Sequence, residues 1–162
     1  MFYFDESGFS LTPVTPYAWQ KGRRVLTVPK ACKKRINVAG FLSRQGHFLY
    51  FQQQENLSSE DIIQAFEIRS RNLARLTIVV LDNASWHTSK ALMDCTRKWE
   101  RRGLLLYFLP PYSPELNRIE LLWKKIKCEW LPLTAWQSWS TFAEELQNVL
   151  DGIGLKYKLT YV

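Results

Sequence analysis

The hydrophobic positions of the chain form short continuous runs separated by polar, Gly-containing or Pro-containing segments. Runs of this length that are rich in β-branched and aromatic residues predict buried β-strands. There are five such runs. The first is 1–9, with the strand ending near Asp5, and the others are 36–43, 47–54, 76–82 and 104–110. Only Arg-Gln-Gly separates the second run from the third, which predicts a tight turn between two strands.

Four other stretches repeat their apolar residues at helical spacing, at 58–76, 88–103, 113–127 and 140–150. The first has a serine at its start, two acids in its first turn and arginines near its end, as the helix dipole favours. The third follows two prolines, with Ser113 as the expected N-cap and Pro114 at the first helical position. Glu115 then lies in the first turn of this helix and Glu120 one turn further in.

The order of these elements predicts the fold class. Three early strands joined by short turns are expected to be antiparallel neighbours, whereas later strands that alternate with helices are expected to be parallel. We therefore expect an α/β protein with a mixed sheet of about five strands, three antiparallel and then two parallel, flanked by helices. The length of 162 residues and the lack of any repeat predict a single domain that spans residues 1–162.

Composition excludes several classes of protein. No run of about 18 apolar residues is present, so we expect no membrane span, and the N-terminal "MFYFDESGF" lacks the pattern of an export signal. Three widely spaced cysteines and two histidines do not provide the close ligand pairs of a structural zinc site. We expect a reduced, intracellular protein.

The positive charge is concentrated in one region. The segment between Glu6 and Glu55 contains eight of the 22 Lys and Arg residues and no acidic residue. The rest of the chain holds 14 basic and 15 acidic residues and is therefore nearly neutral. Such a region favours a polyanion such as nucleic acid, the alternative being a solvated loop that only aids solubility. The candidate DNA-binding residues are Lys21, Arg23, Arg24, Lys30, Lys33, Lys34 and Arg35.

Three acids lie where a structural explanation is weak, because an ionised carboxylate near a core is costly unless it is paired or bound to a cation. Asp5 lies in an aromatic strand, Asp82 ends an apolar strand, and Glu120 lies in a helix that leaves a buried strand. Acids at the ends of adjacent strands converge on one edge of an α/β sheet. Three carboxylates suit Mg²⁺ or Mn²⁺, and two such ions support phosphodiester chemistry.

Each acid also has an ordinary interpretation. Asp82 could cap the turn that follows its strand, and Glu6 rather than Asp5 could be the inward-facing acid, although the two should alternate. Glu120 could form a salt bridge to Lys124 at i, i+4 spacing. Only the three acids together favour a site.

The segments "DESGFS", "VVLDNASWHTSK" and "LPPYSPELNRIELLWKKIK" together resemble the catalytic domain of DDE transposases, the mariner-like superfamily and its bacterial insertion-sequence relatives. The resemblance implies a ribonuclease-H-like fold and metal-dependent cleavage and strand transfer of DNA. It places the catalytic and metal-binding acids at Asp5, Asp82 and Glu120 and implies two Mg²⁺ or Mn²⁺ ions. The implied partners are the DNA of transposon ends and target and a second subunit in synapsis. The implied location is the bacterial cytoplasm, at the nucleoid.

Two features depart from that family. Arg118 stands where the family usually has Pro. Because Met1 lies almost on the first strand, we expect this chain to lack the helix-turn-helix DNA-binding region that precedes the catalytic domain in full-length members. Asn83 and His87 follow Asp82 and could orient a metal ligand or contact phosphate, or could simply form the turn and the helix start. Trp123 and Trp130 fit a core stripe better than a base-stacking platform.

The leading hypothesis is therefore a transposase catalytic domain. The alternatives are an inactive, DNA-binding remnant of a decayed element and a nuclease of the same fold that only hydrolyses DNA.

Overall fold

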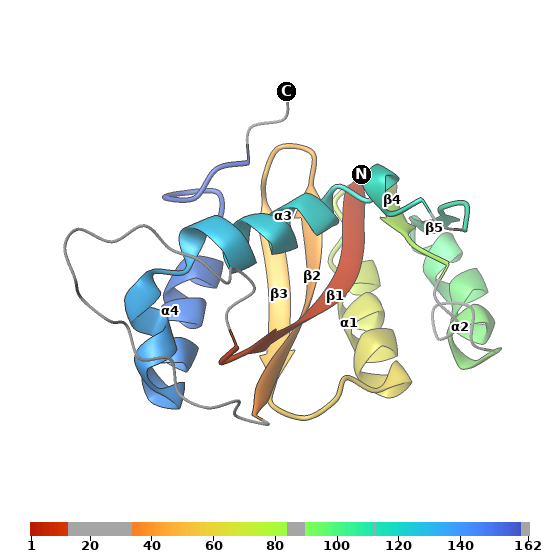
Figure 1. Ribbon diagram of the computed structural model, residues 1–162. Coiled ribbons are helices and arrows are strands. Elements are labelled where there is room, and N and C mark those ends of the chain that lie inside the picture. Colours follow the sequence, from red (N-terminus) through yellow and green to blue (C-terminus); the bar gives the residue numbers. More distant parts are fainter. Residues whose placement is uncertain (13–33, 84–89, 112, 160–162) are drawn as a thin grey trace.

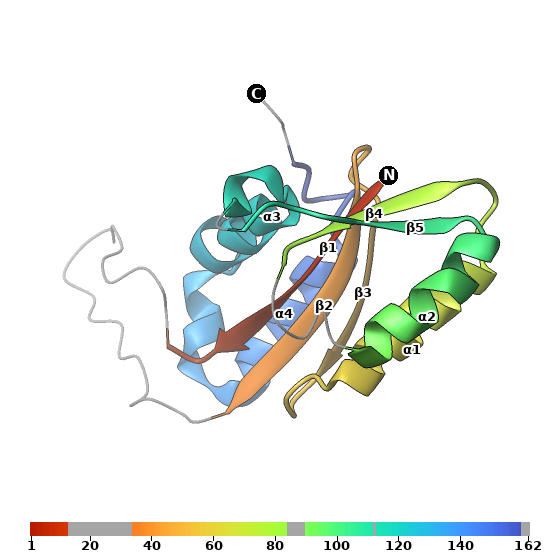
Figure 2. The same ribbon diagram turned by 90° about the vertical axis from the view of Figure 1, so that its right-hand side faces the viewer.

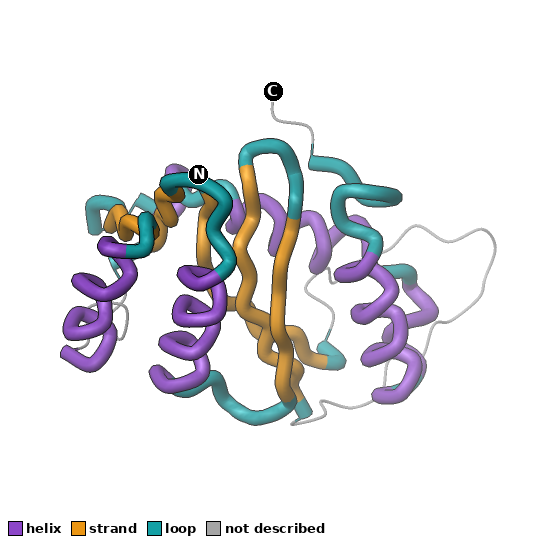
Figure 3. Tube along the Cα trace, turned by 180° about the vertical axis from the view of Figure 1, so that it is seen from behind, coloured by secondary structure: helices purple, strands orange, loops and turns teal. Residues whose placement is uncertain are grey.

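The computed structural model describes residues 1–12, 34–83, 90–111 and 113–159. Its centre is a five-stranded mixed sheet in the order β3-β2-β1-β4-β5, seen from two sides in Figures 1 and 3. The strands are β1 (Phe2–Ser10), β2 (Arg35–Ser43), β3 (Phe48–Gln53), β4 (Thr77–Leu81) and β5 (Leu104–Phe108). β1, β2 and β3 pair antiparallel, whereas β4 runs parallel to both β1 and β5. This confirms the predicted fold class.

Helices cover both faces of the sheet (Figure 2). The helices are α1 (Ser59–Arg71), α2 (Lys90–Arg101), α3 (Ile119–Lys125) and α4 (Trp139–Asp151). α1 and α2 close one apolar core over Phe4, Phe41 and Leu81. α3 and α4 close the second core on the other face, which contains Trp123. Trp123 is 2% exposed and Trp130 packs against the same core, as the core-stripe interpretation predicted.

Local signals explain where these elements begin and end. Ser58 caps α1 through a reciprocal pair of hydrogen bonds with Asp61, which satisfies two backbone amides at the helix start. Gly46 in the β2–β3 turn and Gly103 after α2 have φ angles of 86° and 88°, a conformation that glycine adopts without steric cost. Within the described residues, no helix combines the length and the apolar character needed to cross a membrane.

The first strand is longer than predicted. It continues to Ser10 because β2 pairs with it along its whole length, from Phe2 opposite Ser43 to Ser10 opposite Arg35. The backbone hydrogen bonds that β2 supplies therefore hold β1 extended past the polar residues that suggested its end. Asp5 consequently lies in the middle of β1.

The strands β4 and β5 are less buried than predicted. Ile78 is 39% exposed and Tyr107 58% exposed, whereas Val79 and Leu81 are fully buried against α1 and α2. The reason is that α3 packs against β1 and leaves this face of the two strands partly uncovered. A continuous apolar run was therefore not sufficient evidence for burial on both faces.

Candidate active site

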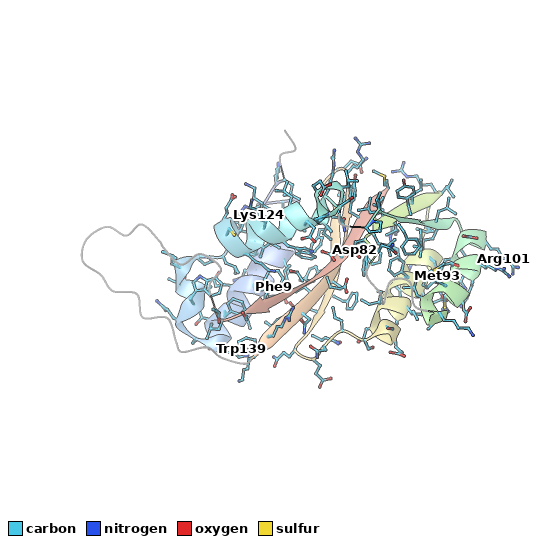
Figure 4. All side chains as sticks on the ribbon, turned by 45° about the vertical axis from the view of Figure 1, so that its right-hand side comes forward. Phe9, Asp82, Met93, Arg101, Lys124 and Trp139 are labelled. Carbon is cyan, nitrogen blue, oxygen red and sulfur yellow. The ribbon has the colours of Figure 1, made fainter. Side chains whose placement is uncertain are left out.

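The site lies beside β1 at the point where its neighbour β4 ends. Phe2 pairs with Val79 and Tyr3 with Val80, so the same register continued along the chain brings Asp5 level with Asp82. β4 ends at Leu81, and the chain leaves the sheet there. The two acids therefore meet at the carboxyl end of β4, where ligands bind in sheets of this kind. Figure 4 labels Asp82 near the middle of the molecule.

The third acid, Glu120, is brought to this edge by α3, which begins later in the chain than the sequence predicted. Instead of one helix from Ser113, the chain forms a 3₁₀ turn (Pro114–Leu116), breaks at Asn117 and begins α3 at Ile119. Ser113 makes no side-chain capping bond. The side chain of Asn117 is 2% exposed, and its Nδ2 donates a hydrogen bond of 3.1 Å to the carbonyl oxygen of Phe4. The start of α3 is thereby fixed to β1 one residue before Asp5.

This break changes the position of Glu120. It lies in the first turn of α3, not one turn further in, so the exposed amides of that turn favour its negative charge as they do for Glu115 in the preceding 3₁₀ turn. The salt bridge to Lys124 that we considered is not formed among the described residues. Position along the helix therefore does not distinguish the two glutamates. Proximity to Asp5 and Asp82 does.

Asp5 is the most buried of the three acids. Its side chain is 8% exposed, and its Oδ2 accepts a hydrogen bond of 3.0 Å from Nε1 of Trp123. Burial, and then the charges of Glu120, Glu6 and Asp82, raise the pKa of Asp5 to about 8. Asp5 is on the face toward α3, while Glu6 alternates away from it and lines a separate polar pocket. Asp5 is therefore the inward-facing acid, and the two acids face opposite ways, as alternation predicted.

The other acidic and basic groups at this edge also influence one another. Burial and then the charge of Asp82 raise the pKa of Glu120. Lys127, seven residues after Glu120, donates a hydrogen bond of 2.7 Å from Nζ to Oγ of Ser7. Burial and then the charge of Arg35 lower the pKa of Lys127, against the opposing effect of Glu120 and Asp5. The edge thus holds three carboxylates that repel one another and one half-buried cation.

This donor set suits a hard divalent cation, since carboxylate oxygens are the ligands that Mg²⁺ and Mn²⁺ prefer. Burial and then the neighbouring carboxylates raise the pKa of Asp5, and a bound cation would oppose the repulsion among the carboxylates. In the described part of the chain, however, no three Asp, Glu, His or Cys side chains lie close enough together to hold a metal ion as they stand. The residue types fit, and the side chains would have to move to bring all three onto one ion.

The remaining candidate residues lie in different places. Asn83 is exposed directly after Asp82. Of the basic candidates, Arg35 lies near Lys127, and Nζ of Lys34 lies 5.8 Å from the ring centre of Trp139 on α4. Six residues singled out from the sequence lie outside the described residues: Lys21, Arg23, Arg24, Lys30, Lys33 and His87.

Two residues at this edge were not found from the sequence. Asn117 resembles an ordinary turn former, and only the contact with Phe4 reveals that it positions α3. Lys127 resembles one of several lysines in a basic helix. Its spacing of seven residues from Glu120, two helical turns on one face, is the signal that could have identified it.

Comparison with known proteins identifies a matching protein family and several similar structures. Residues 1–143 match the model of the family described as DDE superfamily endonuclease. An uncharacterized protein of Sinorhizobium fredii, y4pE/y4sA, is 37% identical over 54 residues, which are 33% of this chain and 36% of that protein. Among solved structures, a simian T-cell lymphotropic virus intasome matches with a TM-score of 0.62 and 12% identity over 99% of this chain and 50% of the other. The mariner Mos1 paired-end complex with Mg matches with a TM-score of 0.61 and 17% identity over 92% of this chain and 47% of the other.

The mixed sheet and its flanking helices form the ribonuclease-H-like fold of transposase and integrase catalytic cores. The chain belongs to the DDE superfamily endonuclease family. It spans about half the length of these two solved proteins.

Proposed function

We propose that this chain is a transposase catalytic domain that cleaves DNA strands and joins the freed ends to target DNA, using divalent cations. The observation that carries the proposal is the position of Asp5, Asp82 and Glu120 at one sheet edge, close enough for the charges of Glu120 and Asp82 to raise the pKa of Asp5. The family match supports the reaction class. The Mos1 complexes with Mg and with Mn support the choice of cation.

Asp5, Asp82 and Glu120 would hold two Mg²⁺ or Mn²⁺ ions, which when bound activate a water or a hydroxyl and stabilise the leaving oxygen. Asp5 must first lose its proton, because its raised pKa keeps it mostly neutral near pH 7. The hydrogen bond from Trp123 fixes the orientation of its carboxylate. Asn117 keeps Glu120 beside Asp5, because its hydrogen bond to Phe4 fixes the start of α3.

The cations at the edge would face the DNA. Lys127 lies next to the carboxylates, with its ammonium group placed by Ser7, and Arg35 is close to it. These two side chains would contact the phosphate beside the cleaved bond. A second subunit would hold the other transposon end, as the paired-end arrangement of Mos1 suggests.

Plasmid nicking tests the proposal. With Mg²⁺ or Mn²⁺ we expect the protein to nick supercoiled plasmid, and Asp82→Asn to lose this activity because it removes a charged ligand without changing the size of the side chain. Asp94→Asn, on the exposed surface of α2, is the matched control and should nick like the wild type. Absence of metal-dependent nicking, or equal nicking by Asp82→Asn, would contradict the proposal. Joining of a pre-cleaved end then distinguishes a transposase from a nuclease that only hydrolyses.

A further inference from the structure

A second concentration of positive charge lies away from the candidate active site. α1 and α2 end side by side, and the C-terminal parts of the two helices with the residues that follow them, 67–76 and 97–103, contain seven basic and two acidic residues. We call the seven the distal basic surface: Arg69, Arg71, Arg75, Arg97, Lys98, Arg101 and Arg102. These segments lead into the first residues of β4 and β5, so they lie at the opposite end of these strands from Asp82. Figure 4 shows Arg101 at the outer margin of the molecule, away from Asp82.

One acid organises the centre of this surface. Glu67 on α1 accepts hydrogen bonds from Arg71, Arg102 and the indole Nε1 of Trp99, and Nζ of Lys98 lies 3.0 Å from its Oε1. The hydrogen bonds and ion pairs from Arg102 and Lys98 lower the pKa of Glu67, so it remains charged. A single carboxylate thus holds three cations and joins the ends of the two helices.

Three of the other four cations have no carboxylate partner in the described part of the chain. Within the described residues Arg75, Arg97 and Arg101 form no ion pair, and all three are exposed. The helix dipole favours a cation or two in the last turn of each helix, but it does not explain seven cations against two acids. Like charges held together repel one another, and a polyanion would relieve that repulsion.

A pocket beside the surface supports the same conclusion. It has a volume of about 400 Å³, and its lining includes Arg69, Asn72 and Arg75 and no carboxylate. The guanidinium of Arg69 is held 4.5 Å from the ring centre of Phe2, and its Nη1 donates to the carbonyl oxygen of Asn72. A fixed guanidinium in a pocket without acids suits a phosphate oxygen.

We infer that the distal basic surface binds the phosphate backbone of a DNA duplex, at a place distinct from the strand being cleaved. The partner is DNA because the cations spread over two helix ends and an adjacent pocket, an extent that suits a long polyanion. The proposed contacts are to phosphates and not to bases. Binding there is independent of sequence and sensitive to salt. It would hold DNA across the side of the domain opposite the candidate active site.

The test uses the double variant Arg75→Ala with Arg101→Ala, which leaves the contacts of Glu67 intact. Affinity for a fluorescent duplex of arbitrary sequence is measured by anisotropy over a range of salt concentrations, without divalent cations so that cleavage plays no part. Each lost phosphate contact lowers the slope of log affinity against log salt by about 0.9, so the expected decrease is about 2. The Arg→Lys version of both positions should retain the slope of the wild type.

The matched control is Lys156→Ala with Lys158→Ala, which removes the same charge from two exposed residues outside the surface. It should leave the slope unchanged. Equal slopes for the two double-alanine variants, with both folded as judged by circular dichroism, would overturn the inference. Because nicking is not measured, this outcome is separate from any failure of the proposed catalytic function.

Discussion

Glu120→Gln is expected to abolish metal-dependent nicking of plasmid DNA while leaving the fold intact. Glutamine keeps the shape of the side chain and an oxygen but loses the charge that binds a divalent cation. Changing a residue that only orients a metal ligand lowers metal affinity or activity about 10- to 100-fold. Loss of a ligand itself should therefore lower the nicking rate by more than about 100-fold. Glutamine has nearly the same volume as glutamate, so the substitution leaves no cavity. Single-turnover nicking rates in Mg²⁺ measure the effect.

Glu115→Gln is the matched control, and the structure makes it a closer match than the sequence suggested. Both glutamates lie in the first turn of a short helical segment, Glu115 in the 3₁₀ turn and Glu120 in α3. Glu115→Gln should remove a favourable interaction with exposed amides, about 0.3–1 kcal/mol, whereas Glu120→Gln should cost no stability without metal, because burial and the charge of Asp82 already disfavour the charged form of Glu120. Two folded variants, with loss of nicking only in Glu120→Gln, separate the two roles. Equal nicking by both variants would show that Glu120 is not a catalytic acid.

Asp5→Asn is expected to stabilise the protein above neutral pH when no divalent cation is present. The pKa of Asp5 is about 8 in the folded state against 3.8 as its ordinary value, so the folded state binds the proton more tightly. The stability that this proton provides is fully present below about pH 4 and is lost as the pH rises through 8. Each unit of pKa shift corresponds to about 1.4 kcal/mol, so several kcal/mol are involved. Asparagine stays neutral and still accepts the hydrogen bond from Trp123.

Thermal unfolding in EDTA between pH 5 and pH 9 measures this difference between wild type and variant. The gap should widen in favour of Asp5→Asn as the pH rises, because the wild type alone acquires a buried charge. Adding Mg²⁺ or Mn²⁺ should stabilise the wild type more strongly at high pH, since the ion and the proton compete for Asp5, and should have little effect on the variant. A constant gap across the pH range would contradict the buried, repelled state of Asp5.

Much of the sheet could be predicted from the sequence because several of its signals are local. The tight turn between β2 and β3 and the alternation of the later strands with helices agree with the observed order β3-β2-β1-β4-β5, whereas a long connection, from Ser10 to Arg35, joins β1 to its antiparallel neighbour β2 and gives no turn signal. The ends of elements were less predictable. β1 extends to Ser10 because β2 supplies hydrogen bonds along its length, and no feature of "DESGFS" itself encodes that pairing.

The three acids were identified from sequence, but the contacts that place them were not. The motif "LNRIELLW" gave a single continuous helical pattern, whereas the chain breaks at Asn117 because its side chain bonds to the backbone of Phe4. Residue 117 lies 113 positions from Phe4 in the sequence, and a contact at such separation leaves no periodic signal. The same holds for the bond from Trp123 to Asp5, which the core-stripe interpretation of Trp123 could not include.

A crystal structure of this chain soaked with Mn²⁺ tests the central claim most directly, because anomalous scattering locates the ion without assumptions about its ligands. We predict anomalous peaks within about 2.0–2.4 Å of carboxylate oxygens of Asp5, Asp82 and Glu120, with the hydrogen bond from Trp123 to Asp5 retained. The same soak of Glu120→Gln should lose or weaken a peak. Manganese bound elsewhere, or no peak at these residues at a Mn²⁺ concentration that supports nicking, would contradict the account.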